Sequence, residues 1–246
     1  MSSRINDKKE FFVFASLLII FTMLYIIGLW LPKSEISISL LLMLSAGFFA
    51  YSTLVTYKFY TGLLNKMYKM LLLASLLIFF IEASFLTGHL LSAPLDVMAI
   101  ILIPVNITFA FSLLMYFKHT YDFWISPLGD KKVFYRIVVG CSVLAAAILA
   151  GGLTLGIKLL AIRYALFFIY SLSILLIICY LVKKIRGGRM GASWRFLLAA
   201  ISLYAVRNML YTIAFLLNHQ NFLNTIGILS MYAYLHAGYG ILKQKF

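Results

Sequence analysis

The chain contains 246 residues, of which 64% are hydrophobic and 11% are charged, and its mean hydropathy is +1.02. This composition excludes a water-soluble globule, because too few polar side chains are available to cover its surface. The net charge of +14 arises mostly from lysines and arginines in short connections beside apolar segments. It therefore favours anionic lipid headgroups as partners and disfavours nucleic acid.

Eight apolar segments are long enough to cross a bilayer as helices. A span needs roughly 20 apolar residues for a hydrocarbon core of about 30 Å, and these runs lack the alternation of barrel strands. We therefore predict an all-α, polytopic integral membrane protein, with a single transmembrane domain over residues 1–246 and no soluble catalytic domain. The predicted spans are residues 11–32, 36–57, 70–92, 96–117, 136–157, 159–182, 195–217 and 222–242.

Basic residues are unevenly divided between the two sides that these spans define. If the amino terminus is cytoplasmic, 17 of the 21 lysines and arginines lie in inner segments, and only Lys33 and Lys158 lie in outer ones. Short cytoplasmic loops of membrane proteins carry such an excess of positive charge. We therefore expect a multi-pass protein of the cell membrane with both termini in the cytoplasm.

A shift of 125 residues aligns the first half of the chain with the second. Four of the eight charged residues between positions 11 and 118 then coincide with charged residues, among them Glu82, which falls on Arg207. Four spans return the chain to its starting side, so two such units would be parallel repeats about an axis along the membrane normal. The alignment predicts repeat halves at 11–118 and 136–243, joined by a linker over 119–135 at the inner interface. Chance similarity of two leucine-rich halves is the alternative.

On the third span, Glu82 and His89 lie seven residues apart and share one helix face. Glu82 is about 12 residues from the inner end of the span, or roughly 18 Å at 1.5 Å per residue, close to the middle of the membrane. Such a polar stripe should face protein or water and not lipid. His89, near the outer edge, either contacts headgroups and solvent or lines a pathway.

The fourth span contains Pro104 and Asn106. A proline within a helix frees a backbone carbonyl, and an asparagine can bond to it or to a neighbouring helix. We therefore predict a kink near the middle of the membrane. The kink would either accommodate packing or shape a binding site.

The fifth and sixth spans carry a packing face and an arginine. Arg163 enters the sixth span from the outer side, near enough to the headgroups for its side chain to extend to them, so we expect it to be an anchor. Small residues on the fifth span would let another helix approach closely, within the molecule or in a homo-oligomer. These residues are Ala146, Ala147, Ala150, Gly151 and Gly152.

Arg207 lies on the seventh span at the same predicted depth as Glu82. A lone charge at the centre of a membrane helix costs about 2.5 to 3.5 kcal/mol on insertion scales, so we predict that the two pair directly or through water. Tyr204 and Tyr211 share a helix face with Arg207 and would hold its guanidinium, and Asn208 adds a polar group beside it. The pair is either a structural clasp or a gate or charged-solute site.

His236 lies on the eighth span toward the inner side, about 20 Å in depth from His89. Zinc ligands lie within about 2.1 Å of the ion, so we predict no metal site, and nothing indicates a cofactor. Cys141, Arg207 and His236 occur in an order that resembles the Cys, Arg and His of exosortase-like membrane transpeptidases. That resemblance would imply nucleophilic catalysis, which needs groups within hydrogen-bond reach, whereas the predicted depths differ. An intramembrane enzyme is therefore a remote alternative.

These features favour a small transporter or permease for a polar, ionic or lipid-headgroup substrate whose identity the sequence does not give. The alternative is a non-transporting membrane sensor, subunit or scaffold whose basic loops dock a membrane or cytoplasmic partner. The two differ in whether Glu82 and Arg207 converge on a hydrated cavity or on a dry helix seam. The candidate binding or gating residues are Glu82, His89, Asn106, Tyr204, Arg207, Asn208, Tyr211 and His236.

Overall fold

A computed structural model describes residues 2–94, 97–98, 101–124, 131–157, 159–184, 188–219 and 222–244. The described part of the chain contains eight long helices and no strand, which confirms the predicted all-α class and the predicted number of helices. The helices are α1 (Ser2–Trp30), α2 (Ser34–Tyr57), α3 (Gly62–Leu90), α5 (Ile103–Trp124), α6 (Lys131–Thr154), α7 (Leu159–Lys184), α8 (Gly188–Leu216) and α9 (Leu223–Leu242).

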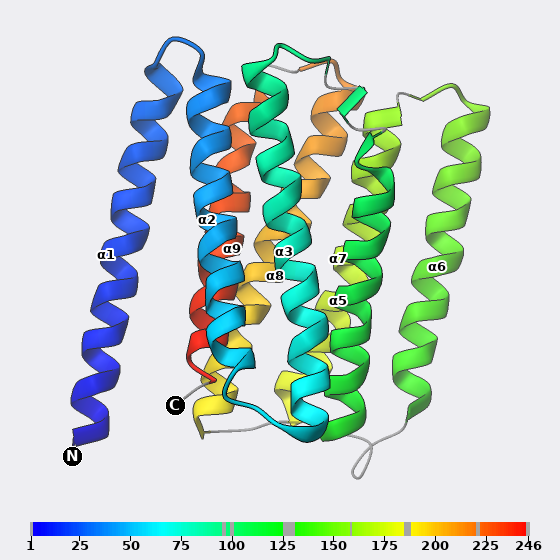
Figure 1. Cartoon of the computed structure of the whole chain (residues 1–246). Coiled ribbons are helices and arrows are strands. Elements are labelled where there is room, and N and C mark those ends of the chain that lie inside the picture. Colours follow the sequence, from blue (N-terminus) through cyan, green and yellow to red (C-terminus); the bar gives the residue numbers. More distant parts are fainter. Residues whose placement is uncertain are drawn as a thin grey trace.

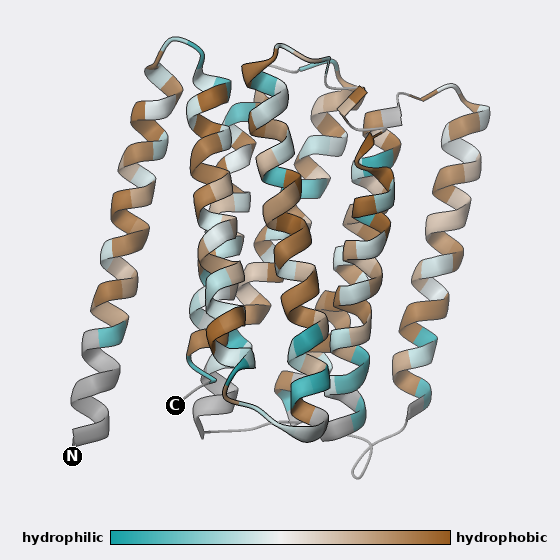
Figure 2. Ribbon diagram, viewed as in Figure 1, coloured by the Kyte–Doolittle hydropathy of each residue, from teal (hydrophilic) through white to brown (hydrophobic). Residues whose placement is uncertain are grey.

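Apolar side chains cover the outside of the bundle. Among the described residues, six helices are long and apolar enough to cross a membrane, namely α1, α2, α3, α6, α7 and α8. Large side chains such as Phe12, Ile107 and Val143 are more than half exposed, and hydrophobic residues extend along the outer helices in Figure 2. Exposing so much apolar surface to water would be costly, so the surface is that of a membrane-embedded protein. Helix α9 is enclosed by its neighbours, since 11 of its 20 residues are buried.

Six helices form a closed ring in the order α2, α3, α5, α7, α8, α9, in which each helix contacts the next and α9 contacts α2. Helix α1 packs outside the ring against α2 and α9, and α6 packs outside it against α7 and α5, as the positions of both in Figure 1 indicate. Exchanging α1, α2, α3 and α5 with α6, α7, α8 and α9 reproduces every one of these contacts. The contact pattern is therefore that of two four-helix units about a central axis, although the internal repeat itself stays a prediction.

The ring has two ends that differ in their side chains. At the terminal end, α1 begins and α9 ends; at the distal end, α1 ends and α9 begins (Figure 1). The terminal half of the ring is filled by a hydrophobic cluster that includes Trp194, Tyr68 and Tyr116. Helices α8 and α9 approach closely there, where the Ser193 hydroxyl donates a hydrogen bond to the Gly240 carbonyl. This half of the bundle is the better packed one.

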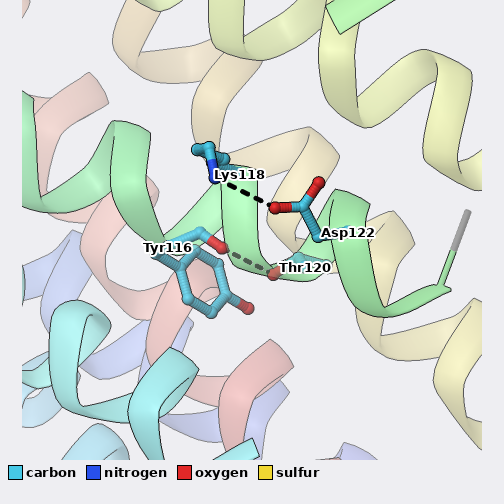
Figure 3. A network of polar contacts seen from close by, with 4 residues as sticks. All are labelled: Tyr116, Lys118, Thr120 and Asp122. Atoms are coloured by element: carbon cyan, nitrogen blue, oxygen red, sulfur yellow. Dashed lines mark hydrogen bonds and ion pairs between the residues drawn. The ribbon is translucent and has the colours of Figure 1, made fainter. Parts of the chain in front are cut away.

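Helix α5 differs most from the prediction for its segment. The fourth span was expected at 96–117, whereas α5 begins at Ile103 and continues to Trp124. Figure 3 shows two contacts along the continued helix: Lys118 and Asp122 form an ion pair of 3.0 Å one turn apart, and the Thr120 hydroxyl donates to the Tyr116 carbonyl at 2.8 Å. The first residues of the expected linker are therefore helical. Its placement at the inner interface stays a prediction, because residues 125–130 lie outside the described part.

Pro104 lies near the beginning of α5, and residues 99–100 before it lie outside the described part. It is the second residue of α5, in the first turn, where the missing backbone N–H would have no helical partner in any case. Asn106 nevertheless bonds to the backbone as expected, since its Nδ2 donates to the Leu102 carbonyl at 2.7 Å. The Leu102 N–H donates to the Met98 carbonyl, and a turn at Leu102 separates helical Ile101 from α5, so the kink expected at Pro104 stays a prediction.

Candidate functional site

A cavity of about 470 Å³ lies inside the ring, in the distal half. Its walls come from α2, α3, α7, α8 and α9, and its volume is in the range of pockets that hold small-molecule ligands. We call it the main cavity. It is lined by Glu35, Ile38, Ser39, Leu42, Glu82, Phe85, His89, Leu160, Arg163, Tyr164, Arg207, Tyr211, Phe215, Leu223 and Asn224.

Glu82 reaches the main cavity because of its spacing on α3. Glu82, Phe85 and His89 recur at intervals of three and four residues, so they share the face of α3 that turns into the ring. Glu82 is 4% exposed, and its Oε1 accepts a hydrogen bond of 2.6 Å from the Tyr234 hydroxyl on α9. The predicted polar stripe on this span thus faces protein and cavity, and Glu82 is bonded to a tyrosine.

Arg207 is held by aromatic rings and one amide. Its guanidinium lies 4.5 Å from the ring centroid of Tyr211 and 5.3 Å from the centroids of Tyr204 and Tyr164. Its Nη1 donates to Asn208 Oδ1 at 2.9 Å, while its Nε is buried without a hydrogen-bond partner in the described structure. Electron-rich faces attract a guanidinium, so these rings fix its position without using its N–H groups.

Arg163 also turns into the main cavity, although the sequence suggested an anchor at the headgroups. Its guanidinium lies 5.2 Å from the ring centroid of Tyr164 and 5.7 Å from those of Phe85 and Phe167. Its Nε and Nη1 are buried and have no hydrogen-bond partner among the described residues. The side chain therefore belongs to the cavity, and Arg163 is the main residue of the site that the sequence reasoning missed.

Glu82, Arg163 and Arg207 form one charged cluster without direct ion pairs. All three line the main cavity, and Glu82 lies near enough to both arginines for their charges to interact. No carboxylate oxygen of Glu82 forms a salt bridge with either guanidinium in the described part of the chain. The direct form of the predicted Glu82–Arg207 pair is therefore not formed, and pairing through water stays a prediction. We call these three residues the charged cluster.

Two smaller voids follow the main cavity toward the terminal end. A void of about 20 Å³ shares Glu82, Arg163 and Arg207 with the main cavity and also contacts Asn106. An apolar void of about 50 Å³ lies beyond it, and the two share Ile78, Tyr204 and Tyr234. These last three residues, which we call the constriction, separate the polar voids from the apolar one. On the terminal side of the apolar void, the hydrophobic cluster fills the inside of the ring.

The structure brings together most, but not all, of the sequence candidates. His89 and Tyr211 line the main cavity, and Asn106 and Tyr204 line the small void. Asn208 lies behind Arg207, where its Nδ2 donates to the Ser171 hydroxyl at 3.2 Å. Their role in binding or gating stays a prediction.

His236 lies apart from the charged cluster. Its Nδ1 is 2.7 Å from the Tyr232 carbonyl, and its ring packs against Phe14 on α1 and Phe196 on α8. Cys141 lies on α6, outside the ring. Neither residue lines the cavity that Arg207 lines, so the resemblance in order to a transpeptidase is not matched by a shared site.

Comparisons with protein-family models, with curated proteins and with solved structures found no match. The chemistry of the site has to be read from its own residues.

Tyr164 and Tyr234 are two further cavity residues that the sequence did not single out. Tyr164 contacts both arginines, and Tyr234 bonds to Glu82. The chain has 16 tyrosines, so neither was distinguishable by type. For Tyr164, position in the sequence was the available signal: Tyr164 follows Arg163 directly, and Arg163 is one of three charged residues that lie more than three residues inside the predicted spans.

The donor groups of the site suit a polar organic or ionic solute. No group of three or more His, Cys, Asp or Glu side chains that could hold a metal ion occurs among the described residues. The cavity instead offers guanidinium donors, one buried carboxylate and aromatic faces. This set can orient a charged solute and exchange hydrogen bonds with it.

Proposed function

We propose that the protein is a small membrane transporter or permease that takes a polar, ionic or lipid-headgroup substrate into the main cavity. The single observation that carries the proposal is that the charged cluster lines a 470 Å³ cavity inside a closed helix ring. A structural clasp would need Glu82 and Arg207 in direct contact at a dry seam, because unpaired buried charges are costly. Charges held apart around a cavity support a solute site.

The series of voids supports movement along the ring axis. The main cavity, the small void and the apolar void share residues in succession, and only the constriction and the hydrophobic cluster interrupt them. Tyr234 belongs to the constriction and bonds to Glu82 in the charged cluster. A solute that competes for Glu82 would loosen Tyr234, so binding and opening of the constriction would be coupled.

The proposed orientation places the distal end outside the cell and the terminal end in the cytoplasm. The excess of basic residues in the predicted inner segments supports this orientation. Two of these residues, Lys58 and Lys183, lie at the terminal end. In this orientation the main cavity faces outward. The basic terminal end would contact anionic headgroups, and the two four-helix units would be parallel repeats that move against each other.

The experiment is solute counterflow in proteoliposomes that contain the purified full chain, with a panel of labelled carboxylates, phosphate esters, amino acids and amines. Glu82→Gln and Arg207→Gln should abolish the flux of any solute that the wild type moves. Asp122→Asn and Lys118→Gln remove the same charges from a partly buried pair on α5 that does not line the main cavity, and they should leave flux unchanged. Normal flux in both cavity variants would contradict the proposal.

A membrane sensor is the second candidate. It is favoured by the closed terminal half, where Trp194, Tyr68 and Tyr116 are fully buried and leave no continuous path. In a sensor, solute binding in the main cavity would change helix packing without passage. The sensor function is supported if solutes bind the purified protein but none crosses the proteoliposome membrane. It is excluded if the protein alone catalyses flux.

A further inference from the structure

The deep end of the main cavity carries more positive than negative charge. Arg163 and Arg207 face the same space as the single carboxylate of Glu82, which already accepts a hydrogen bond from Tyr234. Glu35 is exposed in the first turn of α2, and His89 lies in the last turn of α3, so both are at the distal end, away from the charged cluster. A solute that brings one negative charge would balance the cluster.

Three N–H groups of these arginines lack acceptors in the described structure. They are Nε of Arg207 and both Nε and Nη1 of Arg163, and all three are buried. A buried donor without an acceptor costs free energy, and a charged donor costs more than a neutral one. The planar guanidinium fork fits the two oxygens of a carboxylate or phosphate. These unpaired donors therefore favour binding of an oxyanion in the main cavity.

Aromatic rings hold both guanidinium groups ready for such a ligand. Tyr164 lies beneath both, with its ring centroid 5.2 Å from the Arg163 guanidinium and 5.3 Å from that of Arg207. Tyr164 in turn stacks on Tyr211 with a centroid distance of 4.7 Å. Binding would then immobilise few additional side chains, which favours affinity.

One part of the main cavity's wall is apolar. Leu42, Leu160, Phe215 and Leu223 line it beside the charged cluster. A solute with a short apolar part could contact these side chains while its charged group reaches the arginines. Inorganic anions would leave this wall without contact.

We propose that the main cavity binds a small amphipathic oxyanion, with its carboxylate or phosphate between Arg163 and Arg207 and its apolar part against Leu42, Leu160 and Phe215. One part of this inference rests on the proposed function, namely that the bound solute is also the transported one. The binding itself is testable without any flux.

The test measures thermal unfolding of the purified full chain in phosphatidylcholine nanodiscs, with benzoate and phenyl phosphate as probes. Both should raise the unfolding temperature in a saturable way, because a ligand of the native state stabilises it by mass action. Benzamide and benzylammonium have the same ring without the negative charge and should produce no saturable shift. Equal shifts with all four probes, or no shift with any, would overturn the inference.

Variants identify the site. Arg163→Gln and Arg207→Gln should each weaken benzoate binding about tenfold or more, the effect of losing a charge-assisted hydrogen bond. Arg163→Lys keeps the charge and loses the fork, so it should weaken binding several-fold and serves if the glutamine variants do not fold. Lys118→Gln is the matched control and should bind as the wild type does. Unchanged binding in the arginine variants would place the probe elsewhere and refute the inference.

The oxyanion could belong to a free solute or to a lipid headgroup, and a second nanodisc distinguishes them. In discs with phosphatidylglycerol, a lipid ligand would occupy the site, abolish the benzoate shift and appear in native mass spectra of the wild type but not of Arg207→Gln. A free-solute site would keep the shift. Probe binding without flux of any solute would contradict transport and support the oxyanion site. Flux of a cation or a neutral solute without probe binding would support transport and contradict the oxyanion site.

Discussion

The Tyr234 hydroxyl donates a hydrogen bond of 2.6 Å to Glu82, and this bond joins the charged cluster to the constriction of the ring. The two residues lie on α3 and α9, which are not neighbours in the ring, so the bond crosses its interior. It satisfies one oxygen of a buried carboxylate while leaving the arginine donors free. The bond therefore stabilises the carboxylate without using the unpaired N–H groups of Arg163 and Arg207.

Tyr234→Phe should destabilise the protein by about 1.5 to 3 kcal/mol, since it removes a hydrogen bond to a buried charged group. The measurement is the free energy of unfolding in mixed micelles, followed by circular dichroism during titration with sodium dodecyl sulfate. Tyr51→Phe, at an exposed position on α2, is the control and should stay within about 0.5 kcal/mol of the wild type. An equal effect of both changes would mean that the bond to Glu82 contributes nothing.

Glu82→Gln and Arg207→Gln should be non-additive by about 0.5 to 1.5 kcal/mol when combined, because the two charges interact through the cavity. The same unfolding measurement on both single variants and the double variant gives this coupling energy. Strict additivity would show that the charges do not interact. A coupling energy above about 3 kcal/mol would indicate a direct ion pair, which the structure does not contain.

A cysteine at Ser39 should react with a membrane-impermeant maleimide, because Ser39 lines the main cavity. The background chain carries Cys141→Ala and Cys179→Ala, and labelling is read by mass spectrometry of the purified protein. Ser193→Cys is the matched control, since Ser193 is fully buried in the terminal half and should stay unlabelled. A main cavity closed to water would leave both cysteines unreactive.

The proposed orientation predicts opposite labelling of the two ends in intact cells. Leu155→Cys, in the exposed turn after α6 at the distal end, should react with impermeant maleimide added outside. Lys183→Cys, near the end of α7, should react only after permeabilisation. The reverse pattern would invert the topology and turn the main cavity toward the cytoplasm.

Gly240→Ala should destabilise the contact between α8 and α9 by about 1 to 3 kcal/mol. Its new Cβ would lie 2.9 Å from Phe196 Cβ and 3.1 Å from the Ser193 carbonyl oxygen, neither of which can move without the helix. Gly140→Ala on α6 meets nothing within 4 Å and should stabilise that helix by about 0.5 to 1 kcal/mol. Unfolding titrations of the two variants should therefore shift in opposite directions, and equal shifts would argue against close packing at Gly240.

Much of the site was predictable as a set of residues, and less of it as an arrangement. Glu82 and Arg207 stood out because charges in the middle of apolar segments are rare and costly. Their common depth also followed from residue counting, since each residue adds about 1.5 Å along a helix. Arg163 was found by the same rule but misplaced, because its nearness to the span end suggested contact with headgroups.

The sequence by itself determined that the chain forms eight largely apolar helices and where along the chain each of them lies. The depth of each charge in a membrane stays a prediction. These properties depend on local hydrophobicity and helix rise, which are sums over neighbouring residues. Only the tertiary structure decided that six helices close into a ring, that α5 begins at Ile103, and that Arg163 turns inward to share Tyr164 with Arg207. The direction in which a side chain points depends on the rotation of its helix against its neighbours, and packing between distant segments sets that rotation.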